Sequence, residues 1–140
     1  MTIREAVADD REAVVALWRA CGLTRPWNDA DADFDLALSS PSSTVLVSGN
    51  PVEGAVMVGF DGHRGWVYYL GVRPDRRRGG LGRRLMAAAE DWLKMRGAPK
   101  IQLMVRADNA AATAFHAALG LEPQEVVVMG RRLDGVSGPT

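Results

Sequence analysis

The stretch RRRGGLGRRLMAAAEDWL, residues 76–93, is the most informative segment of this sequence. Five arginines and three glycines fill its first nine positions, and apolar residues then recur at helical spacing. The pattern predicts a glycine-rich basic loop that leads into a helix over about 82–96. The first amides of a helix lack internal partners and the helix dipole adds positive charge there, so this end favours a bound anion. The segment is a candidate phosphate site, and a solvated basic turn is the alternative.

The composition indicates one ordinary globular domain. The chain has 140 residues, of which 47% are hydrophobic and 24% charged, and its formal net charge is zero. This balance predicts no general attraction to nucleic acid or to a membrane surface. Cys21 is the single cysteine, so no internal disulfide is expected. Because no apolar run reaches the roughly 18 residues of a spanning helix, the sequence favours a cytoplasmic protein.

Hydrophobic periodicity predicts the element order βααβββαβαβ, which is a single α/β domain with a mixed, mostly antiparallel sheet and about four helices. The expected strands are 2–7, 43–49, 54–60, 65–72, 100–105 and 125–133, with an antiparallel meander at the three central ones. The expected helices run from a cap at Asp9 or Asp10 to Gly22, over 30–40 after Asn28 or Asp29, over 82–96, and over 110–119 after Asp108 or Asn109. The domain is expected to cover 1–134, with a flexible tail at 135–140.

Two common phosphate-binding motifs are absent from the sequence. It contains neither G-x-x-x-x-G-K-[ST] nor a strand-linked G-x-G-x-x-G with an acidic residue about 20 positions later, which argues against nucleotide hydrolysis and dinucleotide binding. The basic loop instead resembles the acyl-CoA signature V-x-P-x-x-[RQ]-x-x-G-x-[GA] of the GNAT N-acetyltransferase superfamily. The matching residues are Val72, Pro74, Arg77, Gly80 and Gly82.

The later helix also resembles that superfamily, whose pattern there is N-x-x-A-x-x-[FL]-Y-x-x-x-G-[FY]. The matching residues are Asn109, Ala112, Phe115, Gly120 and Leu121. The segments RPWND, DGHRG, YYLGV and KIQ resemble a bacterial subgroup labelled YpeA. Two departures stand out, because Arg78 occupies a position where the family often has glycine and His116 one where it often has tyrosine.

The resemblance implies acetyl-CoA as co-substrate and no metal. Main-chain amides of the basic loop would hold the CoA pyrophosphate, and the pantetheine arm would lie where the fourth and fifth strands splay apart. Asn109 would orient the cofactor, a role compatible with capping its own helix. The expected cofactor-binding residues are Leu70, Gly71, Val72, Arg77, Arg78, Gly79, Gly80, Leu81, Gly82, Arg83 and Asn109.

The implied chemistry requires a donor to the developing oxyanion, a route for the amine proton and a proton for the leaving thiolate. A main-chain amide near Leu70 or Gly71 is expected to serve the oxyanion. His116 is the candidate proton donor, since its unperturbed pKa near 6.5 is close to working pH. The alternative is that His116 is an ordinary helix residue and that water protonates the thiolate.

The general base is not defined by the sequence, because the strand 65–72 carries no carboxylate. The candidates are Asp61 in the adjacent turn, Asp29 or Asp31 after RPW, and a water chain held by Tyr68 and Tyr69. Strand periodicity places the two tyrosines on opposite faces, so one is expected to face the cleft and the other to pack beneath a helix. We assign Tyr68 and Asp61 to catalysis and Tyr69 to the substrate.

The loop LTRPWND, residues 23–29, is expected to form the acceptor-side wall. Arg25 is a candidate for recognising an acidic acceptor and Trp27 for lining the wall. Alternatively, Trp27 packs at the edge of the core and Arg25 pairs with an aspartate. The sequence thus leaves the acceptor side open.

The sequence therefore predicts direct transfer of acetyl from acetyl-CoA to a primary amine of a small molecule or peptide in a ternary complex. The alternative is a catalytically weak acyl-CoA-binding or sensing domain. A homodimer that pairs through 125–133 is a further expectation, and neither nucleic acid nor a membrane is expected as a partner. Cys21 is not assigned as an acyl carrier, because it lies far from the basic loop in sequence.

Overall fold

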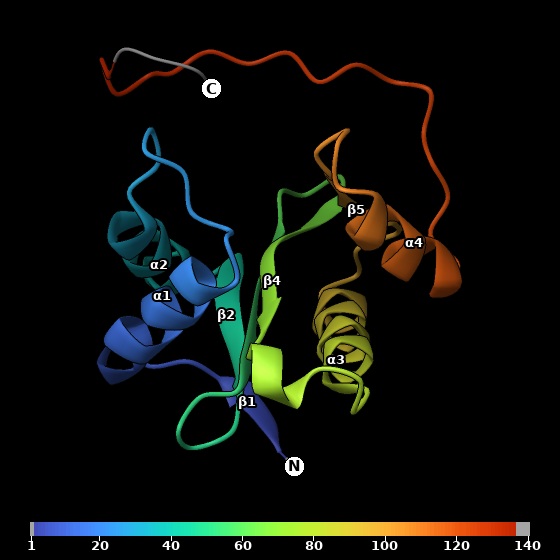
Figure 1. Cartoon of the computed structure of the whole chain (residues 1–140). Coiled ribbons are helices and arrows are strands. Elements are labelled where there is room, and N and C mark those ends of the chain that lie inside the picture. The colour runs from blue at the N-terminus through green and yellow to red at the C-terminus, as the bar shows by residue number, and fades with distance from the viewer. Residues whose placement is uncertain (1, 137–140) are drawn as a thin grey trace. The chain divides into compact units, whose positions relative to one another are not determined.

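The computed structural model describes residues 2–136 of the chain (Figure 1). These residues form two compact units, which divide between Leu103 and Met104. The first unit contains the sheet and three α-helices, and the second contains one α-helix. The predicted α/β class is confirmed, with a mixed five-stranded sheet. No helix within residues 2–136 is long and apolar enough to cross a membrane.

The sheet has the strand order β1-β2-β3-β4-β5. Its first three pairings are antiparallel, as the predicted meander requires, and β4 pairs with β5 in parallel. The parallel strand is shorter than the expected 100–105. The strands are β1 (Ile3–Glu5), β2 (Ser43–Ser48), β3 (Gly54–Phe60), β4 (Gly65–Val72) and β5 (Ile101–Leu103).

Helices cover both faces of the sheet in the first unit. Figure 1 shows α1 (Arg11–Ala20) and α2 (Ala30–Ser39) on one face and α3 (Leu81–Met95) on the other. Trp18 and Phe34 are fully buried beneath the first two helices. On the other face α3 approaches the sheet so closely that a Cβ atom on Gly65 would lie 2.5 Å from the Leu93 Cδ1 atom. Burial of the apolar stripe of each helix against the sheet therefore builds the core.

The helix ends follow local sequence signals with one exception. The Asp29 side chain caps α2 by accepting a hydrogen bond from the Ala32 amide at 3.0 Å, and Gly22, with φ of 70°, follows the end of α1. Asp10 is the N-cap residue of α1, one of the two residues expected there, but its side chain makes no bond to the helix amides, because a 3-10 turn (Ala8–Asp10) precedes this helix. The Asp10 carboxylate is engaged elsewhere, with the Val7 amide and the Arg4 guanidinium.

The second unit contains α4 (Ala110–Ala118), which the Asn109 side chain caps as expected by accepting from the Ala112 amide at 3.0 Å. The strand expected at 125–133 is wrong, since these residues have no regular secondary structure. A strand needs a hydrogen-bonded neighbour, and none pairs with this segment within residues 2–136. Its apolar residues 126–129 are 65–90% exposed. Residues 137–140 of the expected tail lie outside the described part of the chain.

Candidate active site

One edge of β4 is open along half of the strand. β5 pairs with Gly65–Val67 only, so residues 68–72 have no strand on that side within the described chain. Main-chain groups on such an edge can pair with an extended ligand. This gap agrees with the expected splay between the fourth and fifth strands.

The open part of β4 contains a β-bulge. Ala55 on β3 pairs with Gly71, and Met57 pairs with Tyr68. Two residues of β4, Tyr69 and Leu70, therefore lie opposite the single residue Val56 of β3. Tyr69 has φ of 57°, in the left-handed region that bulky residues rarely adopt. A bulge of this kind bends the strand and redirects its main-chain groups.

The two tyrosines of β4 lie on the same face of the sheet, so the prediction from strand alternation is wrong. Tyr68 pairs with Met57, which packs against the core beneath α1 and α2 as Tyr69 does, because the bulge interrupts the alternation. The Tyr69 ring stacks on Trp18 at 4.2 Å between centroids, and its hydroxyl donates to Asp33 Oδ2 at 2.7 Å. Tyr68 is 41% exposed and its ring lies 6.5 Å from that of Trp66. Burial and then Asp33 raise the pKa of Tyr69, whereas burial and then Asp61 raise the pKa of Tyr68. Tyr69, assigned to the substrate from sequence, is thus the tyrosine packed beneath the helices.

The loop after β4 leads into α3 with an open N-terminus. Gly80 is the N-cap with φ of 82°, and the first main-chain bond of the helix joins the Arg84 amide to the Gly80 carbonyl. The amides of residues 81–83 precede that bond, so they have no partner in the helix. A Cβ atom on Gly79 would meet only Arg76 O at 3.8 Å, and one on Gly80 only Arg84 Nη1 at 3.6 Å. The loop backbone is therefore open to a ligand.

The arginines of this loop differ in their contacts. Arg76 donates from Nε to Glu53 Oε1 at 3.0 Å, and Arg84 donates to the Gly79 carbonyl at 3.2 Å. The side chains of Arg78 and Arg83 are exposed and make no hydrogen bond or ion pair within residues 2–136. Arg78 also has φ of 72°, which explains physically why glycine is the easier residue at this position. The side chains of these last two arginines are available to an anion.

Two donors from distant parts of the chain meet at the end of β4. The Cys21 thiol donates to the Val72 carbonyl at 3.3 Å, and Arg77 Nε donates to the same oxygen at 3.1 Å. Cys21 precedes Val72 by 51 residues. Sequence distance alone therefore gave no sign that this cysteine lies beside the candidate site.

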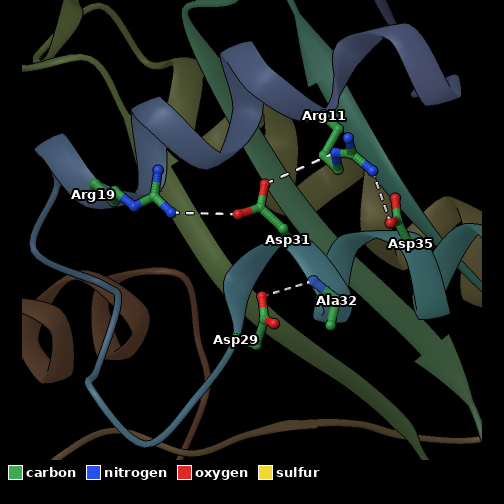
Figure 2. Close-up of polar contacts among 6 residues, drawn as sticks. All are labelled: Arg11, Arg19, Asp29, Asp31, Ala32 and Asp35. Carbon is green, nitrogen blue, oxygen red and sulfur yellow. Dashed lines mark hydrogen bonds and ion pairs between the residues drawn. The ribbon is translucent and has the colours of Figure 1, made fainter.

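Ion pairs link α1 and α2 at their surface (Figure 2). Arg11 lies 2.9 Å from Asp35 and 3.8 Å from Asp31, and Arg19 lies 3.4 Å from Asp31. Each pair is solvent-exposed, so each adds little stability. Together they fix which aspartates of α2 face α1.

The loop 23–29 is braced by its own arginine. Arg25 Nη1 donates to the Gly22 carbonyl at 2.8 Å and to the Thr24 carbonyl at 2.9 Å. This contact replaces the aspartate partner considered from the sequence. Trp27 in the same loop is partly buried.

Asp61 holds the turn between β3 and β4. Its Oδ1 atom accepts from the amides of His63 at 2.8 Å and Arg64 at 2.7 Å. These bonds, the Arg64 one foremost, lower the pKa of the Asp61 carboxyl. A carboxylate stabilised in this way is a weaker base.

His116 in the second unit is partly buried on α4. Its ring meets the Phe115 ring edge-on at 5.0 Å, and its Nδ1 atom is buried without a hydrogen-bond partner in the described chain. Burial lowers the pKa of His116 below its usual 6.5, so the neutral imidazole predominates at pH 7. Within residues 2–136, no group of three or more His, Cys, Asp or Glu side chains could hold a metal ion.

Comparison with known proteins gives the same fold and places the chain in a family. Residues 11–121 match the family model described as the acetyltransferase (GNAT) family. The chain belongs to the GNAT acetyltransferase family. An acetyltransferase of Pectobacterium atrosepticum is 44% identical to this GNAT protein over 135 residues, which cover 95% of the chain and 96% of the relative.

Solved structures share the fold at lower identity. The aminoglycoside N-acetyltransferase AAC(6')-Iy, solved in complex with CoA, superposes with a TM-score of 0.80 at 20% identity, covering 94% of each chain. The aminoglycoside 6'-N-acetyltransferase AAC(6')-IG from Acinetobacter haemolyticus gives a TM-score of 0.76 at 21% identity, covering 96% of this chain and 100% of that one. These likenesses confirm the GNAT fold of the protein.

Proposed function

We propose that this GNAT protein transfers the acetyl group of acetyl-CoA directly to a primary amine. The observation that carries the proposal is that the open edge of β4 at 68–72 leads into the glycine-lined, basic N-terminus of α3. An open strand edge can pair with the extended pantetheine arm, and a helix N-terminus can hold the pyrophosphate. The aminoglycoside acetyltransferases of this fold, one of them in complex with CoA, support both a CoA thioester and an amine acceptor.

On the cofactor side, main-chain amides from Arg77 to Gly82 would bind the pyrophosphate. The Leu81 side chain is buried, so this residue contributes its amide alone. The exposed guanidinium groups of Arg78 and Arg83 would reinforce phosphate binding. The Val72 carbonyl already accepts two protein hydrogen bonds, so the pantetheine arm would pair with groups of Leu70 and Gly71.

The transfer step needs few protein groups. The amine nitrogen attacks the thioester carbon, the carbonyl oxygen gains negative charge, and CoA leaves as a thiolate. We assign the amide of Leu70 or Gly71, at the β4 bulge, to the carbonyl oxygen. Tyr68 would hold the water that carries the amine proton away, since its raised pKa keeps the phenol protonated. Asp61 would shape this turn rather than accept the proton, because its pKa is lowered.

The acceptor would bind beside the loop 23–29. Arg25 bonds to loop carbonyls through one nitrogen, and the remaining donors of its guanidinium can still bind a carboxylate of the acceptor. Trp27 would line the same wall, and Tyr69 would shape it from beneath. Asn109 in the second unit would orient CoA in addition to capping α4.

The decisive experiment measures release of free CoA thiol from acetyl-CoA in the presence of a panel of primary amines, with mass analysis of the acetylated product. The panel contains a polyamine, an aminoglycoside, an amino acid and a lysine peptide. Sustained turnover with one of them is the expected result. Tight acetyl-CoA binding without turnover on any amine would favour the sensing domain, and ADP binding as tight as acetyl-CoA would contradict a CoA site.

Direct transfer makes a separate prediction for Cys21. The variant Cys21→Ser should retain turnover within about threefold, because the thiol makes only one weak hydrogen bond to Val72. Intact mass spectrometry of the wild-type enzyme with acetyl-CoA alone should show no acetylated protein. A stoichiometric acetyl adduct that disappears in Cys21→Ser would replace direct transfer with a covalent route.

We also propose His116 as the donor that protonates the CoA thiolate. Only the imidazolium can donate, and burial lowers the pKa of His116, so kcat should rise as the pH falls through that pKa below 6.5. The variant His116→Ala should lose this limb of the pH profile and about 100-fold of kcat at pH 6, with its CoA affinity retained. An unchanged pH profile in His116→Ala would leave water as the donor.

A second copy of the chain would cover the exposed apolar residues 126–129. An extended segment with unpaired main-chain groups and apolar side chains can form a strand when it pairs with another chain. Light scattering of the full chain across a concentration series tests this, and a monomer at all concentrations would contradict it.

A further inference from the structure

The aspartates of α2 have different partners. Asp29 caps the helix, and Asp31 and Asp35 face the arginines of α1 (Figure 2). Asp33 instead accepts the Tyr69 hydroxyl hydrogen bond at 2.7 Å and so links α2 to β4. Asp33 directly precedes Phe34, which is fully buried, so it lies at the border of the buried stripe of the helix.

Tyr69 has a backbone conformation that requires external support. Its φ of 57° lies in the left-handed region, which a β-carbon disfavours, and such a residue persists only when its surroundings hold it. The buried Trp18 ring supports the Tyr69 ring from one side. Stacking alone allows the two rings to slide, whereas a hydrogen bond to a carboxylate has direction. The hydrogen bond to Asp33 therefore fixes the position of the Tyr69 hydroxyl group.

The residues that follow are equally constrained. A Cβ atom on Gly71 would lie 3.2 Å from the Leu23 Cδ1 atom and 3.3 Å from the Cys21 Sγ atom. The bulge is thus held by the Tyr69 side chain and, two residues later, by close packing at Gly71, and both contacts are made on the α1 side. Both constraints act on the short segment 69–71, which lies in the part of β4 that β5 does not pair with.

We propose that Asp33 is a positioning residue, which acts through Tyr69 to hold the β4 bulge so that the amide of Leu70 or Gly71 is aimed at the thioester carbonyl. This inference rests on the proposed acetyl transfer. Stabilisation of a developing oxyanion depends on donor geometry, so a small displacement of the bulge lowers the rate of transfer more than the binding of CoA. Asp33 touches neither substrate nor cofactor in this role.

The proposal differs from a general-base role for the same carboxylate. An asparagine at this position keeps an oxygen that accepts the Tyr69 hydroxyl bond but has no basicity. A positioning role therefore predicts that Asp33→Asn is close to wild type and that Asp33→Ala is impaired. A base role predicts that the two variants are equally impaired.

The kinetic test compares kcat and the KM for acetyl-CoA in Asp33→Asn, Asp33→Ala, Tyr69→Phe and the double variant Asp33→Ala/Tyr69→Phe. We expect kcat to fall about tenfold in Asp33→Ala and in Tyr69→Phe. A misaligned oxyanion donor should lower kcat less than the complete removal of that donor does. The double variant should be no worse than either single variant, since both break one contact. Asp35→Ala, on the same helix and paired with Arg11, is the matched control and should retain wild-type kcat.

A second measurement does not depend on activity. Backbone amide resonances of Leu70 and Gly71 in ¹H–¹⁵N spectra of the full chain should shift in Asp33→Ala and in Tyr69→Phe but not in Asp35→Ala. If Asp33→Ala does not fold, Tyr69→Phe and Asp33→Asn, which change fewer atoms, still provide both readouts.

Several results would overturn the proposal. These are unshifted Leu70 and Gly71 resonances in Tyr69→Phe, an unchanged kcat in that variant, or an Asp33→Asn enzyme as slow as Asp33→Ala. Failure of the wild-type chain to turn over acetyl-CoA would overturn the proposed function instead, while the spectra would still report whether Asp33 holds the bulge.

Discussion

The β4 bulge and the loop before α3 each contain a non-glycine residue in the left-handed region, Tyr69 with φ of 57° and Arg78 with φ of 72°. Tyr69 is held by a buried tryptophan and a carboxylate from two different helices. The Arg78 side chain is exposed and bonds to nothing within residues 2–136. The comparison shows that similar backbone strain has a tertiary cause in the bulge and a local one in the glycine-rich loop.

Glycine at position 69 should break the bulge. Tyr69→Gly relieves the left-handed strain but removes the ring from Trp18 and the hydroxyl from Asp33, so we expect a loss of about 3 kcal/mol in the free energy of unfolding. Urea denaturation followed by circular dichroism measures this loss. A variant as stable as the wild type would mean that the ring does not support the bulge.

A β-branched residue at the cap of α3 should break the loop. Gly80→Val is strained at φ of 82°, so the loop must move and the amides of residues 81–83 lose their common direction. We expect the Kd for CoA to rise about 30-fold or more, which corresponds to the loss of one or two charge-assisted hydrogen bonds. Isothermal titration calorimetry measures it.

The matched control is Gly97→Val at the opposite end of the same helix. Gly97 has φ of 80° and no atom within 4 Å of an added Cβ, so it carries a similar strain away from the loop. Its variant should lose stability without losing CoA affinity. Equal losses of affinity in the two variants would show that general destabilisation, and not the displacement of the loop before α3, weakens CoA binding.

Glycine at position 78 should have the smallest effect and the opposite sign. Arg78→Gly removes about 1–2 kcal/mol of left-handed strain and adds about 0.5–1 kcal/mol of backbone entropy cost. We therefore expect the free energy of unfolding to rise by up to about 1 kcal/mol. The Kd for CoA should rise a few-fold, because one phosphate-binding side chain is lost. A clear fall in stability would mean that Arg78 has a structural role.

Much of the fold could be predicted from local patterns. The helix expected over 82–96 is Leu81–Met95, and the caps at Asp29 and Asn109 are where residue type predicts them. The prediction differs from the structure where a partner outside the local pattern decides the outcome. Asp10 is the N-cap residue of α1 but its carboxylate bonds to Arg4 instead of the helix amides, and the β-prone segment 125–133 has no strand to pair with in the described chain.

The candidate site divides in the same way. The basic loop was visible in the sequence, whereas Asp33 and Trp18 were not assigned to the site, and the sequence did not decide which tyrosine of β4 packs beneath the helices. The only signal for Asp33 was its place beside the buried stripe of α2. Helical periodicity indicates that Asp33 lies beside the buried stripe of α2, but it does not indicate that Tyr69 is its partner.

The sequence by itself determined the glycine-rich loop and the helix after it, because backbone freedom and helical periodicity are properties of neighbouring residues. The tertiary structure alone decided that Asp33 meets Tyr69 across 36 residues and that Cys21 meets Val72 across 51. These contacts depend on how α1 and α2 pack against β4 and on the bulge that turns Tyr69 toward them. A glycine-rich loop before a helix can bind an anion in any fold that contains one, whereas the contacts of Tyr69 and Val72 exist only once the helices pack against the sheet.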